Sequence, residues 1–131
     1  MEVLSSRLLI RSPDPGRSRR FYRDVLGLAV YREFGPAGNP GIVFFAGPGF
    51  IEVSPGGGPG ADAVGPPHAI WLQVRDVAAE HTRLTEAGVT VMRGPRREPW
   101  GLIEMWIEDP DGTPLVLVQV PEDHPLRRDP R

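Results

Sequence analysis

Apolar and polar positions divide the chain into short stretches that are separated by clusters of proline and glycine. Alternation with a period of two is typical of strands that bury one face, whereas spacings of three and four residues indicate helices. Helical spacing occurs in two stretches, 15–26 and 77–87. The expected strands are 4–12, 28–34, 41–46, 49–54, 68–75, 89–93, 101–108 and 114–120.

The ends of both expected helices carry residues suited to those positions. Asp14 and Asp76 can cap the two N-termini, and Pro15 suits a first helical position. Gly27 and Gly88 follow the last helical residues, where glycine commonly ends a helix. The apolar face of the first helix is expected to consist of Phe21, Tyr22, Val25 and Leu26.

The order of strand, helix and three strands occurs twice. Asp14 corresponds to Asp76, and Gly27 to Gly88. One such unit could not bury its sheet alone, but two together can. The sequence therefore predicts an α+β fold of paired βαβββ modules forming a curved eight-stranded mixed sheet, with the helices on the convex face and a cavity on the concave face. The expected parts of this single domain, 1–131, are module one at about 4–54, a linker at 55–67, module two at about 68–120 and a tail at 121–131.

Composition narrows the classes of function. The length of 131 residues favours one domain, and 40% apolar residues are typical of a globular protein. A net charge of −2 without a basic stripe argues against a nucleic-acid partner. The absence of cysteine excludes disulfides and thiolate metal sites, and it fits a cytoplasmic protein. No long apolar run is present, so neither a signal peptide nor a membrane span is expected.

Strand alternation assigns side chains to the two faces of the sheet. Wholly apolar sets, such as Ile51 with Val53 and Ile103 with Met105, are expected to pack against the helices. The opposite face combines aromatic and charged groups, as ligand pockets do. A solvated sheet face is the alternative, although two exposed tryptophans would be costly. The predicted binding set is Arg7, Arg11, Phe50, Glu52, Trp71, Gln73, Glu104 and Trp106.

Four motifs carry a resemblance to a known family. They are Asp14-Pro15-Gly16-Arg17-Ser18, the stretch from Phe21 to Leu28, Trp100-Gly101 and Asp109-Pro110-Asp111-Gly112, the last of which also predicts a hairpin turn. Over about residues 4–120 the chain resembles the vicinal oxygen chelate superfamily, which includes glyoxalase I, bleomycin-resistance proteins and extradiol dioxygenases. The resemblance implies paired βαβββ modules, often in a two-fold dimer.

The resemblance also implies where enzymes of this family hold a divalent metal, namely on the first and last strand of each module. The corresponding positions are Arg7, Glu52, Ala69 and Val116. Only Glu52 could bind a metal, because a guanidinium has no lone pair to donate and the other two side chains are aliphatic. No metal site is therefore expected, and Arg7 is predicted to pair with Glu52 instead. A bulge that turned His68 inward, or a weak site of Glu52 and Glu104, would restore metal binding.

Two functions remain open. The first is a metal-free, homodimeric protein without a cofactor that binds a small, flat or cationic organic molecule, in the manner of the bleomycin-resistance branch. The second is an enzyme, either a lyase, isomerase or dioxygenase with a displaced divalent metal, or a metal-free catalyst with Glu52 or Glu104 as acid and base. A regulatory partner with an empty cavity is a third class. For His81 and His124, surface positions are expected.

Overall fold

The computed structural model describes residues 1–55 and 67–124, so most of the expected linker and the end of the tail lie outside the described residues. The first βαβββ unit contains a short π-helix, η1, after its α-helix. The elements in chain order are β1 (Ser5–Ser12), α1 (Pro15–Arg20), η1 (Phe21–Val25), β2 (Val30–Phe34), β3 (Gly41–Ala46), β4 (Gly49–Pro55), β5 (His68–Gln73), α2 (Val77–Glu86), β6 (Thr90–Arg97), β7 (Ile103–Glu108) and β8 (Pro114–Gln119). This repeated order confirms the α+β fold class.

The chain forms two compact units. The first half is Arg7–Ala69, and the second half combines Met1–Ser6 with Ile70–Arg131. The opening residues join the second half through the Leu4 N–H, which donates to the Gln73 carbonyl at 2.9 Å. The helices of the described residues are all too short or too polar to cross a membrane.

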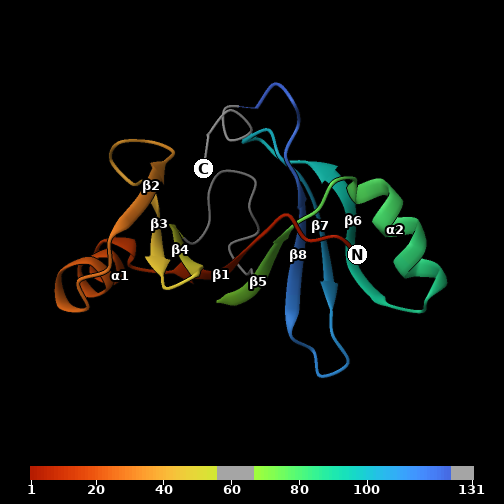
Figure 1. Cartoon of the computed structure of the whole chain (residues 1–131), viewed down its shortest axis with the longest axis horizontal. Coiled ribbons are helices and arrows are strands. Elements are labelled where there is room, and N and C mark those ends of the chain that lie inside the picture. Colours follow the sequence, from red (N-terminus) through yellow and green to blue (C-terminus); the bar gives the residue numbers. More distant parts are fainter. Residues whose placement is uncertain (56–66, 125–131) are drawn as a thin grey trace. The chain divides into compact units, whose positions relative to one another are not determined.

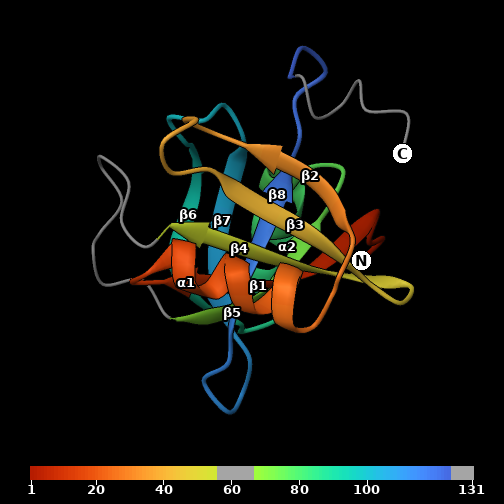
Figure 2. The same ribbon diagram turned by 90° about the vertical axis from the view of Figure 1, so that its left-hand side faces the viewer.

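The sheet of the first half has the strand order β2-β3-β4-β1. Strands β2 to β4 pair antiparallel, as the predicted meander requires, and β1 pairs parallel with β4. Ile42, Phe44 and Val53 form its buried core, and Tyr22 packs against them from the helical segment. Figure 2 shows α1 lying across β4 and β1. Helical cover therefore occupies one face of this sheet and leaves the other for Arg7 and Glu52.

The helix expected over 15–26 is wrong in its second part. Only Pro15–Arg20 is an α-helix, and a wider π-helical turn follows, closed by the Leu26 N–H donating to the Phe21 carbonyl at 2.9 Å. The wider turn changes which side chains share a face. Only Tyr22 reaches the core, whereas Phe21, Val25 and Leu26 are 47%, 73% and 52% exposed.

The sheet of the second half has the strand order β5-β8-β7-β6, with β5 and β8 parallel and the other pairs antiparallel. Helix α2 lies over β6, β7 and β8 (Figure 1). Its Val77 and Leu84 pack with Val74, Met105 and Leu117 of the sheet. This cluster confirms the predicted assignment of the apolar face, because these sheet residues alternate with Glu104 and Trp106.

Capping and turn residues lie where the sequence places them. The carboxylates of Asp14 and Asp76 accept from the backbone N–H groups of Arg17 and Ala79, both at 3.1 Å. The hairpin turn at 109–112 is closed by a backbone hydrogen bond between its first and last residues at 3.0 Å. Strand β6 extends beyond its predicted end at residue 93 to Arg97, with irregular register after Val91.

Candidate functional site

The buried carboxylate of Glu52 is held by two side chains of the first half. Arg7 Nη1 donates to Glu52 Oε1 at 2.7 Å, and the Ser54 hydroxyl donates to Oε2 at 2.8 Å. The side chains of Arg7 and Glu52 are 8% and 10% exposed. The pairing follows from the parallel register of β1 and β4, in which Leu9 lies opposite Glu52. The predicted ion pair is thereby confirmed.

Phe50 lies in an aromatic cluster on the same sheet. Its ring centroid is 4.8 Å from that of Tyr31 and 5.6 Å from that of Phe45. Phe45 lies directly opposite Phe50 in the register of β3 and β4. Sequence reasoning found Phe50 but missed both partners, because the run 41–46 is apolar at every position and alternation cannot assign its faces. A register shift between Val30 and Arg32 further obscures Tyr31.

Four other predicted binding residues share the face of the second sheet that is opposite α2. One cross-strand row consists of Trp106, Val116 and Trp71, and the next consists of Glu104, Val118 and Gln73. Trp71, Glu104 and Trp106 are buried. The register thus brings two tryptophans and one carboxylate to a single face.

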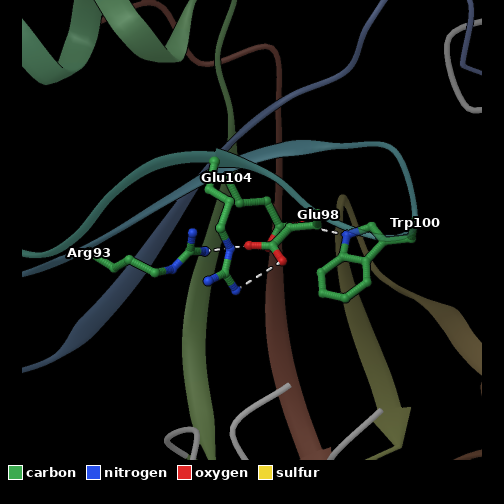
Figure 3. Close-up of polar contacts among 5 residues, drawn as sticks. Arg93, Glu98, Trp100 and Glu104 are labelled. Atoms are coloured by element: carbon green, nitrogen blue, oxygen red, sulfur yellow. Dashed lines mark hydrogen bonds and ion pairs between the residues drawn. The ribbon is translucent and has the colours of Figure 1, made fainter. Parts of the chain in front are cut away.

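A hydrogen bond from an indole holds the carboxylate of Glu104. Trp100 lies in the segment between β6 and β7, and its Nε1 donates to Glu104 Oε2 at 2.7 Å (Figure 3). The Trp100 side chain is otherwise half exposed, so its ring remains accessible. On the backbone side, His124 Nε2 donates to the Trp100 carbonyl at 2.9 Å. This contact lies at the surface, as expected for His124, and it connects residue 124 with the segment between β6 and β7.

Glycine at position 101 allows this contact with His124. Gly101 has a φ of +91°, and a Cβ placed there would lie 3.0 Å from His124 Cδ2. A larger residue would strain the backbone and press on the imidazole. The Trp100-Gly101 pair therefore positions the indole of Trp100 and leaves room for the imidazole of His124.

A third buried carboxylate, Glu98, lies in the segment between β6 and β7. Arg93 Nη2 donates to Glu98 Oε1, and Arg96 Nη2 donates to Oε2 at 3.3 Å (Figure 3). The Glu98 side chain is only 3% exposed. Sequence reasoning missed this trio, because irregular register between Arg93 and Arg96 breaks the alternation on which it relied. Three arginines around position 95 were the available signal.

The predicted set of eight is thus divided between the halves. Arg7, Arg11, Phe50 and Glu52 belong to the first half, and Trp71, Gln73, Glu104 and Trp106 to the second. Arg11 of β1 lies opposite Ser54 of β4. His68 is exposed at the start of β5, whereas the neighbouring Ala69 is buried. The inward bulge at His68 is therefore not present.

The model of the glyoxalase/bleomycin resistance protein/dioxygenase superfamily matches residues 5–117. The chain belongs to this superfamily. Among curated proteins, none matches it significantly.

Solved structures give the superfamily fold independent support. A structure described as an NAD-dependent benzaldehyde dehydrogenase from Legionella pneumophila has a TM-score of 0.71 at 14% identity, covering 88% of this chain and 99% of its own. A superfamily member from Vibrio splendidus 12B01 has a TM-score of 0.62 at 16% identity, and the match covers 87% of this chain and 96% of its own. The methylmalonyl-CoA epimerase from Mycobacterium tuberculosis has a TM-score of 0.58 at 16% identity, and the match covers 92% of this chain and 93% of its own. At these identities the likeness shows the fold alone.

The residues at the superfamily's metal positions do not fit a divalent cation. Arg7 brings a permanent positive charge, and both oxygens of Glu52 already accept hydrogen bonds. Ala69 and Val116 have no donor atoms, whereas a stable site needs about three protein ligands. Within residues 1–55 and 67–124, no three histidine or carboxylate side chains are grouped to hold a metal ion.

Proposed function

We propose that this superfamily member binds a small organic molecule without the help of a metal ion. The observation that carries the proposal is the state of Glu52, the one candidate ligand among the superfamily's metal positions. Its carboxylate accepts from Arg7 and Ser54, so a cation would have to displace a buried guanidinium. Displacement would leave Arg7 buried without its counter-charge, which is strongly unfavourable.

The proposed binding face is the side of the second sheet opposite α2. Trp71 and Trp106 flank Val116 in one row of this face, and Gln73 and Glu104 flank Val118 in the next row. Trp100 adds a half-exposed ring next to Glu104. Few polar groups among aromatic walls are the composition that small-molecule sites share.

Tryptophan fluorescence tests this proposal directly, because Trp71, Trp100 and Trp106 all lie in the second half. We expect at least one member of a panel of flat anionic, cationic and neutral molecules to change the emission in a saturable way. The same dissociation constant should be measured before and after treatment with a chelator. A Trp106→Phe variant should bind more weakly. A thermal unfolding curve of the variant confirms that it is still folded.

Two results would contradict the proposal. One is binding that a chelator abolishes and a single added divalent metal restores, which would indicate a displaced metal site. The other is the absence of any saturable change across the whole panel, which would favour a protein with an empty cavity.

An enzyme that uses Glu104 as acid or base is the second candidate. The observation that favours it is a buried carboxylate held in one orientation by the Trp100 indole, as a proton-transfer group must be. Because one protein of similar fold is the methylmalonyl-CoA epimerase from Mycobacterium tuberculosis, methylmalonyl-CoA is a first compound to test. Solvent deuterium incorporated by the wild type but not by Glu104→Gln would establish this activity.

We also propose that the protein is a homodimer. Phe21, Val25 and Leu26 of the first half expose apolar side chains close together in the chain, and such patches often mark interfaces. Light scattering after size exclusion should give twice the chain mass for the wild type. Val25→Asp should give the monomer mass, whereas a dimeric Val25→Asp protein would rule out this face.

A further inference from the structure

Arg93 has a donor that its own surroundings leave unused. Its Nη2 donates to Glu98, but Nη1 is buried and has no hydrogen-bond partner among the described residues. Figure 3 shows that second terminal nitrogen turned away from the carboxylate. A buried donor without an acceptor is costly, so such a group in a native protein calls for an acceptor such as a water or an ion.

Glu98 cannot supply the missing acceptor. Its Oε1 accepts from the other terminal nitrogen of Arg93 and its Oε2 accepts from Arg96, so neither oxygen is hydrogen-bonded to Arg93 Nη1. The Arg96 side chain is 53% exposed, so its remaining donors are accessible from solvent. The trio of Arg93, Arg96 and Glu98 therefore has guanidinium donors that Glu98 does not use.

The position of the trio connects it with the proposed binding face. In the register of β6 and β7, Arg93 lies opposite Trp106 and Arg96 lies opposite Glu104. Opposite residues of an antiparallel pair share a face, so both arginines stand at the edge of the two rows that contain the tryptophans. Trp100, half exposed, follows Glu98 by two residues.

We propose that Arg93 and Arg96 form an anion subsite, and that the ligand is a flat molecule with a carboxylate or phosphate group. The anionic oxygens would accept from Arg93 Nη1 and from Arg96, while the ring of the ligand would lie against the half-exposed indole of Trp100. Guanidinium groups recognise both kinds of anion through charge-assisted hydrogen bonds. This inference rests on the proposed binding function and names the chemical class of its ligand.

Three probes of one size separate charge from shape, namely benzoate, phenyl phosphate and the neutral benzamide. We expect the wild type to bind benzoate or phenyl phosphate about tenfold more tightly than benzamide, since hydrogen bonds to charged groups are the stronger class. The preferred anion identifies the group. Indole N–H signals in nitrogen-15 spectra, assigned with Trp→Phe variants, give the dissociation constants.

The decisive variant is Arg93→Lys, which keeps the positive charge next to Glu98 but loses the second terminal nitrogen. It should remove the preference for the anion while leaving the affinity for benzamide unchanged. Arg97→Gln is the matched control, because Arg97 lies on the same strand and donates to the Gly101 carbonyl. That control should keep the preference. Equal losses in the two variants, or equal affinities of benzoate and benzamide in the wild type, would overturn the inference.

A second measurement separates the inference from the binding function. Inorganic phosphate should raise the melting temperature of the wild type above that in chloride at the same ionic strength, and it should not do so in Arg93→Lys. A phosphate effect without binding of any aromatic probe would support the anion subsite and contradict the wider binding function. Binding of neutral or cationic molecules, with neither an anion preference nor a phosphate effect, would support the function and overturn the subsite.

Discussion

The two halves repeat one chain order but use their buried carboxylates differently. In the first half, Glu52 is matched by the guanidinium of Arg7 and the hydroxyl of Ser54, both buried or half-buried. In the second half, Glu104 accepts from the indole of Trp100, whose ring stays half exposed. The first arrangement stabilises the sheet interior, whereas the second connects a buried charge with an accessible aromatic surface. Duplicated architecture thus does not imply duplicated chemistry.

The helical segments of the two halves differ in how much of their apolar surface they bury. Helix α2 buries Val77 and Leu84 against its sheet. The α1–η1 segment buries no residue fully and exposes most of its apolar side chains. The second half therefore buries the apolar face of its helix against its own sheet, while the first half leaves most apolar side chains of its helical segment exposed.

The strongest test of the comparison is Arg7→Ala. Removing one member of a buried ion pair leaves the other charge uncompensated, so the free energy of unfolding should fall by about 4 kcal/mol. Urea denaturation measures this change. Arg23→Ala, in an exposed pair with Asp24, is the control and should leave the free energy of unfolding nearly unchanged. If the two variants were equally stable, Glu52 would not depend on Arg7.

The double variant Arg7→Met with Glu52→Gln sharpens this test. Because both charges are removed together, it should recover much of the stability that Arg7→Ala loses. A double variant as unstable as the single one would show that packing of the Arg7 stem matters more than its charge.

The two helical segments can be compared by truncating one apolar residue in each. Leu84→Ala should lower the free energy of unfolding by about 3 kcal/mol, because it opens a cavity in the α2 core. Phe21→Ala, at a half-exposed ring, should cost about 1 kcal/mol or less in the monomer. Denaturation at low protein concentration measures both. A larger loss at Phe21 would mean that η1 packs more closely than its exposure indicates.

The indole of Trp100 offers a smaller test within the second half. Trp100→Phe keeps an aromatic ring but removes the donor to Glu104, so stability should fall by about 1 kcal/mol. A double-mutant cycle with Glu104→Gln measures the coupling between the two side chains. A coupling energy near zero would argue that the hydrogen bond does not hold the carboxylate in solution.

The smallest expected effect concerns pH and the hairpin of the second half. The backbone N–H of Thr113 and then that of Asp111 hold the pKa of Asp109 below its usual range. A lowered native pKa stabilises the fold above the unfolded value of about 4, and this contribution is lost as pH falls through the native pKa. Asp109→Asn should therefore melt slightly lower than the wild type at neutral pH, and the difference should shrink below about pH 4. A difference in melting temperature that stays constant across this pH range would show that titration of Asp109 does not contribute to stability.

Sequence reasoning succeeded wherever alternation and turn chemistry were regular. The faces of β4 and β7 could be assigned because Ile51 alternates with Glu52, and Met105 with Glu104. The pairing of Arg7 with Glu52 was predicted from the two metal positions that the family resemblance implies for β1 and β4. The hairpin at 109–112 followed from residues that favour tight turns.

It failed where the backbone departs from regular periodicity. The π-helical turn at 21–25 changes the faces of Phe21 and Val25, and nothing in the apolar spacing distinguishes it from an α-helix. The irregular register of β6 brings Arg93 and Arg96 to one carboxylate that lies outside any strand, Glu98. Tertiary contacts of this kind depend on loop geometry that local patterns do not encode.

The grouping of the first six residues with the second half has a consequence for synthesis of the protein. Leu4 is translated before the first half, but Gln73, whose carbonyl accepts its N–H, is translated only after the whole first half. Glu2 and its ion-pair partner Arg75 are separated in the same way. The leading segment therefore completes its contacts late, and fragments designed to reassemble should keep residues 1–6 together with the C-terminal piece.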